Sequence, residues 1–457
     1  MSNTGISKER IATLTQREVQ TFALNNPKSR IASKDAGDLL LWGVPMVWQA
    51  GIEGPFSLFM ESGRDNRVRD LDGHDYLDLS MGVYATLGHA DPRYLTPLKE
   101  SMENGLQHQY PSMILLDVAR ELNARLGNFR WNFSLNGTDA NRWAIRLARH
   151  LTGRSKVLIP NYAYHGTVEE VQVLRGDDGT IDYYDSDVGT PPARAGDRTR
   201  IVEYNDLSTL EEELRHGDVA VVMMEPAMTN IGLVLPDPGY HDGVRALSRK
   251  YGSLLLIDET HTMWSGPAGL TGRWGLEPDI WTAGKIIGGG VPAGVYGFRD
   301  DLSRQLGETL RHSGEGLVGI GGTFSGGSHS LQGIHANLKY MLTPQNFARI
   351  EEMGSYATRG LQTVIDDLEL PWHMGEQLGA RVTYHFTPTP CRTMTDYVDK
   401  VHDDDLTYLL NLSMLNRGVM AMAFNNCWMV LPHCTPADID LAVDAFRDSC
   451  QQLTVGT

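Results

Sequence analysis

The stretch SLLLIDE, residues 253–259, decides the fold that we expect for this chain. Four apolar residues, 254–257, are followed at once by the acidic pair Asp258 and Glu259. A short continuous apolar run of this kind is typical of a strand buried on both faces of a parallel sheet. Ligands of open α/β sheets bind at the carboxyl ends of the strands. The sequence therefore predicts that Asp258 is buried beside a ligand site, where its carboxylate needs a partner.

Two further runs, KVLIP (156–160) and VAVVMMEP (219–226), have the same character. Amphipathic helical stretches lie between the runs, namely DANRWAIRLARHLTG (139–153) and GYHDGVRALSRKYG (239–252). Alternating strands and helices predict a parallel sheet with helices on both faces. We therefore expect a large α/β domain at 76–340.

The two chain ends are expected to build a smaller α+β domain. Residues 1–75 read as an N-terminal arm and part of this domain, with a hairpin signal at Asp72-Gly73. Residues 341–457 read as helix, strands and helix. The last helix has Thr435 as its predicted N-cap and Pro436 as its first residue.

The overall composition narrows the class of protein. The chain has 457 residues, 41% of them hydrophobic, and a formal net charge of −17. This charge argues against nucleic-acid or membrane partners, and no apolar run approaches the ~20 residues that span a bilayer. The four cysteines, Cys391, Cys427, Cys434 and Cys450, lack the spacing of metal ligands or of a secreted disulfide framework. We expect a cytoplasmic protein without a metal site, and we find no signal peptide.

Three segments besides SLLLIDE place polar residues just after predicted strands or before helices. Asn136-Gly137-Thr138 precedes a helix and could bind a phosphate, although a plain helix cap is the favoured explanation of this segment taken alone. Tyr164-His165 follows KVLIP and offers an aromatic ring for stacking, or simply a tyrosine at a loop edge.

The remaining two residues of interest are an acid and a base. Glu225 follows the strongly apolar part of VAVVMMEP and either caps a loop or orients a polar group in a cleft. Lys285 stands in TAGKIIGGG, where small residues allow a ligand to come close. A lysine in such a place could form a Schiff base. Together, a phosphate cradle, a stacking ring, a carboxylate for a ring nitrogen and a lysine are the parts that hold pyridoxal phosphate.

These motifs resemble the class III (subgroup II) aminotransferases of pyridoxal-phosphate fold type I, near the branch of glutamate-1-semialdehyde aminomutases and β-amino-acid aminotransferases. The resemblance covers roughly residues 50–450. It implies a mostly parallel seven-stranded sheet. It also implies a homodimer with active sites at the subunit interface.

The resemblance also assigns roles to individual residues. It implies that Lys285 carries the Schiff base and Asp258 contacts the pyridine nitrogen. It implies that Asn136, Gly137 and Thr138 bind the phosphate, and that Tyr164, of the Tyr164-His165 motif, stacks on the ring. Glu225 would lie near the ring oxygen, and Thr323 would reach the phosphate of the partner subunit's cofactor.

The chain departs from the family pattern at the substrate side. Thr260 stands where the family usually has valine or isoleucine after Asp-Glu, and His261 follows it. The stretches GVPMVWQAG (43–51) and FNNCWMVLP (424–432) lack the arginines that bind a substrate carboxylate in the family. Either another basic residue does this, or the substrate is not a simple amino acid. Trp48, with Gln49, is a candidate for the substrate pocket, and so are Thr260 and His261.

The leading hypothesis is an aminotransferase that moves an amino group between an amine or amino acid and a carbonyl or keto-acid acceptor. An aminomutase or an ammonia-lyase on the same scaffold is the alternative. A non-catalytic protein of this fold is disfavoured, because such a protein is expected to lose Lys285 or Asp258.

Overall fold

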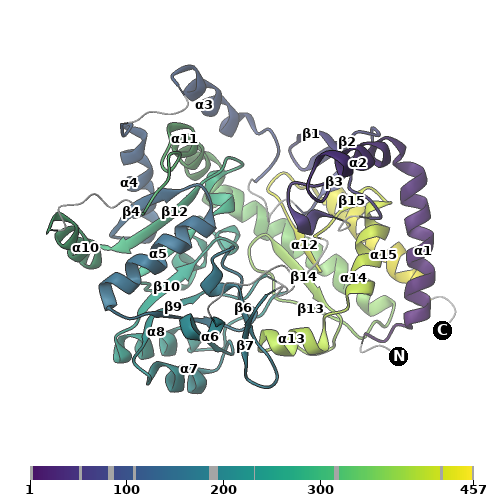
Figure 1. Ribbon diagram of the computed structural model, residues 1–457. Helices are drawn as coiled ribbons and strands as arrows, with labels where there is room; N and C mark the ends of the chain where they lie inside the picture. The colour runs from purple at the N-terminus through teal and green to yellow at the C-terminus, as the bar shows by residue number, and fades with distance from the viewer. Residues whose placement is uncertain are drawn as a thin grey trace.

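The computed structural model describes residues 4–50, 54–80, 87–105, 110–184, 194–230, 232–312, 319–422 and 426–454. Gly51, Phe424 and Asn425, which belong to the two stretches without arginine, lie outside the described residues. Figure 1 shows a larger α/β part and a smaller part to which both ends of the chain contribute.

A seven-stranded sheet forms the centre of the larger part, in the order β4-β12-β11-β10-β9-β5-β8. Only β12 among these strands runs antiparallel to its neighbours, so the sheet is mostly parallel as expected. The strands are β4 (Phe129–Ser134), β5 (Lys156–Pro160), β8 (Thr199–Val202), β9 (Val219–Met224), β10 (Leu254–Asp258), β11 (Ile280–Ala283) and β12 (Gly294–Arg299).

The apolar runs are buried on both faces because helices cover both. Every residue of β9 is buried, and its side chains alternate between two clusters. Val221 and Met223 pack with α5 (Gly137–Thr152). Val222 and Met224 pack with residues of α8 (Tyr240–Tyr251) on the other face. This arrangement explains why the run carries no polar alternation and confirms the predicted fold class.

Strands from both chain ends join in the smaller part (Figure 1). Strand β15 (Val419–Met420) pairs in parallel with β3 (Asp75–Asp78), which completes the sheet β1-β2-β3-β15. The predicted turn at Asp72-Gly73 joins β2 (Arg67–Asp70) to β3. The division of the chain at residues 75 and 340 stays a prediction.

Long helices support this sheet. Helix α1 (Lys8–Asn25) packs on α14 (Asp404–Leu415), and α12 (Pro344–Asp367) packs on α15 (Pro436–Thr454). Thr435 and Asp438 exchange hydrogen bonds at the start of α15, as the predicted cap requires.

The other elements complete the two parts. They are α2 (Pro27–Leu39), β1 (Met60–Arg64), α3 (Pro92–Glu103), α4 (Ile114–Leu126), β6 (Val173–Arg175), β7 (Ile181–Tyr183), α6 (Ala195–Arg198), α7 (Leu207–Leu214), α9 (Gly269–Trp274), α10 (Asp300–His312), α11 (Ser328–Ala336), β13 (His373–Met374), β14 (Arg381–His385), α13 (Met394–Lys400) and β16 (Cys427–Met429). None of the described helices is long and apolar enough to cross a membrane. The four cysteines are free thiols.

Candidate active site

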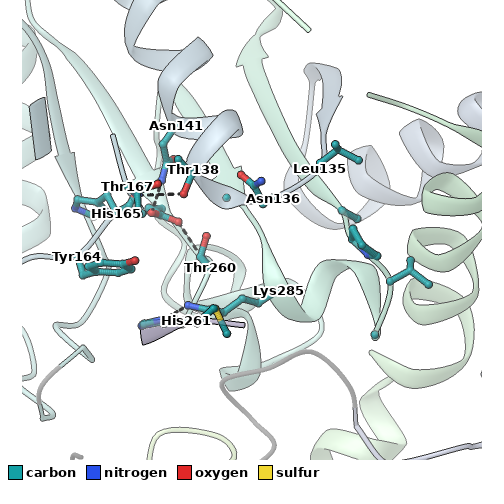
Figure 2. A pocket seen from close by; sticks show the side chains of 18 residues that line it. Leu135, Asn136, Thr138, Asn141, Tyr164, His165, Thr167, Thr260, His261 and Lys285 are labelled. Carbon is teal, nitrogen blue, oxygen red and sulfur yellow. Dashed lines mark hydrogen bonds and ion pairs between the residues drawn. The ribbon is translucent and has the colours of Figure 1, made fainter. Parts of the chain in front are cut away.

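A cavity of about 490 Å³ opens where the loops after β4, β5, β10 and β11 meet (Figure 2). This is the edge of the sheet at which the sequence predicted a ligand site. Most of the predicted site residues line it, namely Asn136, Gly137, Thr138, Tyr164, His165, Asp258, Thr260, His261 and Lys285.

Four predicted residues lie elsewhere. Glu225 is buried next to the loop after β9 and reaches the cavity only through His261. Trp48 is 40% exposed on a short helical turn shared with Gln49, and Met46 from the same segment lines the cavity instead. Thr323 is exposed in the loop before α11.

Asp258 is held as a buried anion at the end of β10. Its Oδ2 accepts hydrogen bonds from Asn141 Nδ2 at 2.8 Å and pairs with His165 Nδ1 at 2.9 Å. Its Oδ1 accepts from the Thr260 backbone N–H at 2.9 Å. Burial alone raises the pKa of Asp258, but the contacts with His165 and Thr260 outweigh it and leave the pKa below its usual value. Asp258 is therefore a permanent negative charge beside the cavity.

Its sequence neighbour Glu259 has a different environment. The Glu259 carboxylate accepts hydrogen bonds from Thr262 and from the backbone N–H groups of Leu270 and Thr271 at the start of α9. It is fully buried and does not line the cavity. Glu259 thus fixes a loop to a helix, while Asp258 faces the ligand site.

The start of α5 presents unpaired backbone donors to the cavity. The Asn136 side chain caps the helix by accepting from Asp139 N–H at 2.8 Å. Within the described part of the chain, the N–H groups of Gly137 and Thr138 have no hydrogen-bond acceptor. Such donors at a helix N-terminus suit an anion such as a phosphate.

Close contact of two backbones places Lys285 opposite this helix start. A Cβ built on Gly284 would lie 2.6 Å from the backbone nitrogen of Gly137, so only glycine fits there. Lys285 itself adopts a left-handed conformation with φ 50°, which non-glycine residues rarely adopt outside functional sites. Its partly exposed side chain faces the cavity. Burial lowers the pKa of its amine to about 8.

His261 connects Lys285 with Glu225 (Figure 2 shows the Lys285–His261 contact). Its Nε2 lies 2.5 Å from Lys285 Nζ, and its Nδ1 lies 3.2 Å from Thr229 Oγ1. The Thr229 hydroxyl donates to Glu225 Oε2. Burial moves the pKa of His261 well below its usual value, with the charge of Lys285 acting in the same direction. Burial raises the pKa of Glu225 to about 7.

Thr260, the other departure from the family pattern, ties two strand ends together. Its Oγ1 accepts from the Gly284 N–H at 3.0 Å, and it lies 2.9 Å from a Cβ built on Gly137. The hydroxyl therefore bonds the backbone after β11 to the loop after β10, and only a glycine at position 137 leaves room for it.

Three functional residues escaped the sequence prediction. Asn141 bridges Asp258 and the carbonyl of His165, and Thr229 bridges His261 and Glu225. Arg381 is 2% exposed, its Nε has no hydrogen-bond partner among the described residues, and its Nη1 donates to the Cys427 sulfur at 4.0 Å. Its charge lowers the pKa of Lys285, so it acts on the site electrostatically although it does not line the cavity. Its position between the apolar residues Ala380 and Val382, at the start of β14, was a signal that could have identified it.

Comparison with known proteins agrees with this geometry. The family model for class-III aminotransferases matches residues 49–373. The chain is 31% identical to glutamate-1-semialdehyde 2,1-aminomutase 2 of Halalkalibacterium halodurans over 87% of this chain and 91% of that protein.

Solved structures are similar over nearly the whole chain. A glutamate-1-semialdehyde aminomutase from Pseudomonas aeruginosa PAO1 superimposes with a TM-score of 0.94 at 34% identity, covering 98% of this chain and 100% of that one. A variant of that protein was solved in complex with PMP. A β-phenylalanine aminotransferase from Variovorax paradoxus has a TM-score of 0.83 at 25% identity, covering 96% and 97% of the two chains.

This protein belongs to the class-III aminotransferase family and has the fold of the pyridoxal-phosphate enzymes of fold type I. It is therefore an enzyme, and its cofactor is pyridoxal phosphate. The expected family and cofactor are confirmed, and so is the expectation of an enzyme.

Proposed function

We propose that this enzyme transfers an amino group between an amine or amino acid and a carbonyl or keto-acid acceptor, with Lys285 as the cofactor-bonding and proton-transferring residue. The observation that carries the proposal is the position of Lys285. Its amine faces the same cavity as the permanent anion Asp258 and the unpaired N–H groups of α5.

The residues around the cavity fit the cofactor. The N–H groups of Gly137 and Thr138 would hold its phosphate, and Asp258 would pair with its ring nitrogen. The Tyr164 ring lines the same cavity and would stack on the cofactor ring. When bound, pyridoxal phosphate accepts the electron pair released at the substrate carbon.

The protein's own groups supply the remaining chemistry. An amine with a pKa of about 8 is neutral in roughly a tenth of molecules at pH 7, so Lys285 can both accept and donate a proton near neutral pH. Asp258 keeps its charge because its pKa lies below the usual value. Asn141 and His165 fix the direction of that charge.

Borohydride trapping tests the role of Lys285. Reduction of the holoenzyme should fix the cofactor to the peptide that contains Lys285, as read by mass spectrometry. Lys285→Ala should yield no such peptide, with Lys339→Ala as a matched control at a residue away from the cavity. An unchanged yield of adduct in Lys285→Ala would overturn the assignment.

An intramolecular aminomutase is the second candidate, favoured by the 31–34% identity to glutamate-1-semialdehyde aminomutases. A screen of amine donors with keto-acid acceptors separates the two. Amino transfer between separate molecules supports the aminotransferase. Isomerisation of glutamate-1-semialdehyde without an added acceptor supports the aminomutase, and release of free ammonia would identify a lyase.

A homodimer is proposed as the active unit, with Thr323 reaching the partner subunit's phosphate site. Large apolar side chains are exposed near Thr323 and before α4, namely Phe324 at 59%, Met113 at 73% and Tyr110 at 78%. Helices α4 and α11, which follow these residues, pack together, so the exposed groups mark one candidate interface. We also infer a cytoplasmic location, since the described cysteines are free thiols. Sedimentation of the holoenzyme tests the dimer.

A further inference from the structure

We propose that His261, Thr229 and Glu225 form a buried proton relay that removes the proton from the Lys285 amine and returns it. The proposal rests on the proposed role of Lys285 as the proton-transferring group. His261 and Thr229 are positioning residues in it, and Glu225 is the group that stores the proton.

The contacts form one unbroken line from the cavity into the protein. Lys285 Nζ lies 2.5 Å from His261 Nε2, and His261 Nδ1 lies 3.2 Å from Thr229 Oγ1. Thr229 Oγ1 bonds Glu225 Oε2, and the Thr229 N–H donates to Oε1 at 3.3 Å. His261, Thr229 and Glu225 are 8%, 1% and 2% exposed, so bulk water has little access to the line.

The hydrogen bonds along this line can point in only two consistent directions, because the Thr229 hydroxyl and the neutral His261 ring each have one proton to give. In the first, the Lys285 ammonium donates to Nε2, the His261 Nδ1–H donates to Thr229, and the Thr229 O–H donates to the Glu225 carboxylate. In the second, every bond is reversed. Lys285 is then a neutral amine and Glu225 a neutral carboxylic acid.

The two arrangements differ by the shift of one proton along each of three hydrogen bonds. The Lys285 nitrogen loses one proton and the Glu225 carboxylate gains one. His261 gains a proton at Nε2 and loses one at Nδ1, and the Thr229 hydroxyl accepts that proton and gives its own to Glu225. No heavy atom has to move, and no solvent proton is needed. The relay thus makes the Lys285 amine neutral without releasing a proton to water.

The electrostatics make the exchange nearly balanced. The pKa values of Lys285 and Glu225, about 8 and about 7, differ by about one unit, which is roughly a tenfold preference for the first arrangement. His261 transmits protons without keeping one, because burial moves its pKa well below the usual value. Asp258, His165 and Arg381 also face these groups. Their charges are part of the balance at Lys285, His261 or Glu225.

The relay predicts how the rate of amino transfer depends on pH. Below about pH 7 Glu225 is already protonated and cannot accept the Lys285 proton, so the rate falls along an acid limb set by Glu225. When the line is cut, this limb follows Lys285 alone and moves up by about one unit. A histidine that only fills space beside Lys285 predicts no such movement.

Thr229 gives a matched pair of variants, since it contacts neither Lys285 nor the cavity. Thr229→Val removes the hydroxyl at nearly constant volume, and Thr229→Ser keeps it. With the amine half-reaction followed by absorbance from pH 5.5 to 9.5, Thr229→Val should move the acid limb up by about one unit. The rate at pH 7 should then fall about fivefold. Thr229→Ser should match the unmodified enzyme within about twofold.

A second measurement does not depend on activity. In protein labelled with ¹⁵N-histidine, the His261 signal, assigned by its loss in His261→Asn, should be that of a neutral ring in fast exchange between the two tautomers. The Nδ1–H form should predominate, and Thr229→Val should abolish this exchange. Glu225→Gln, which cannot store the proton, should abolish the tautomer exchange of His261 as Thr229→Val does, and it serves where that variant does not fold.

Coinciding pH profiles for the unmodified enzyme and Thr229→Val, or a His261 ring that titrates between pH 6 and 8, would overturn the relay. Those outcomes leave the role of Lys285 untouched, because borohydride trapping on Lys285 is independent of Thr229. Loss of that trapping result would instead refute the proposed function.

Discussion

The contact between Gly284 and Gly137 gives a sharp test of how the cavity is built. Gly284 precedes Lys285, and Gly137 begins α5, whose free N–H groups we assign to the phosphate. A Cβ on residue 284 would meet the Gly137 nitrogen at 2.6 Å and its Cα at 2.9 Å, whereas ordinary contacts begin at 3.4 Å. Both partners are backbone atoms, so no side chain can turn away. Gly284→Ala must therefore separate the lysine from the helix start.

The size of the effect follows from this geometry. Gly284 has φ −128° and ψ −157°, an extended conformation that alanine adopts without strain, so the effect is purely steric. Overpacking of this kind costs about 1–3 kcal/mol. If the strain falls on the cofactor site, the affinity for pyridoxal phosphate should drop by about 5- to 150-fold.

Absorbance titration of the cofactor-free protein with pyridoxal phosphate measures this affinity. Gly37→Ala is the matched control, because a Cβ on Gly37 meets nothing within 4 Å. Circular dichroism checks that both variants remain folded. An affinity of Gly284→Ala within twofold of the unmodified protein, with Gly37→Ala unchanged as well, would refute the assignment of α5 and Lys285 to one cofactor site.

Two further predictions concern the charges around the site. Asp258→Asn should retain the cofactor but slow the half-reaction by about 10- to 150-fold, because a charge-assisted hydrogen bond worth about 1.5–3 kcal/mol is lost. Stopped-flow absorbance checks this, and a near-normal rate would count against the pairing of Asp258 with the ring. Arg381→Met should raise the free energy of unfolding of the cofactor-free protein, as measured by denaturant titration, by about 1–4 kcal/mol, because it replaces a buried cation that has no carboxylate partner in the described structure. It should also move the pH profile of Lys285 reactivity upward, because Arg381 lowers the pKa of Lys285. A destabilised variant with an unmoved profile would show that Arg381 is a packing residue.

The sequence predicted the central sheet well because a strand buried on both faces has a continuous run of apolar residues. KVLIP coincides with β5, and the runs ending at Glu225 and Glu259 contain β9 and β10. The same apolar runs located the site, since the residues that follow such strands meet at one edge of the sheet. Asp258, Tyr164 and Lys285 were found in this way and do line one cavity.

Other features depend on distances between segments far apart in sequence, and no local pattern records them. Thr229 acquires its role only because the loops after β9 and β10 bring it between His261 and Glu225. Met46 lines the cavity while Trp48 faces outward, because a short helical turn sets which side chain points inward. A tryptophan and a methionine in an irregular segment give no periodicity from which this could be inferred.

The two carboxylates nearest Lys285 show how the same chemical group receives opposite tasks. Asp258 is surrounded by donors, from Asn141, His165 and the Thr260 backbone, and its pKa lies below the usual value despite burial. Glu225 is as deeply buried but, among the described residues, accepts hydrogen bonds only from Thr229, and its pKa rises to about 7. A fixed charge suits a ring nitrogen that must stay protonated, and an exchangeable one suits a proton store. Because His261 contacts Lys285 on the side of Glu225, the exchangeable carboxylate is the one connected to the lysine by hydrogen bonds. Cutting this connection at Thr229 should therefore change the pH profile, whereas Asp258→Asn should lower the rate at every pH and act on the profile only through its charge on Lys285.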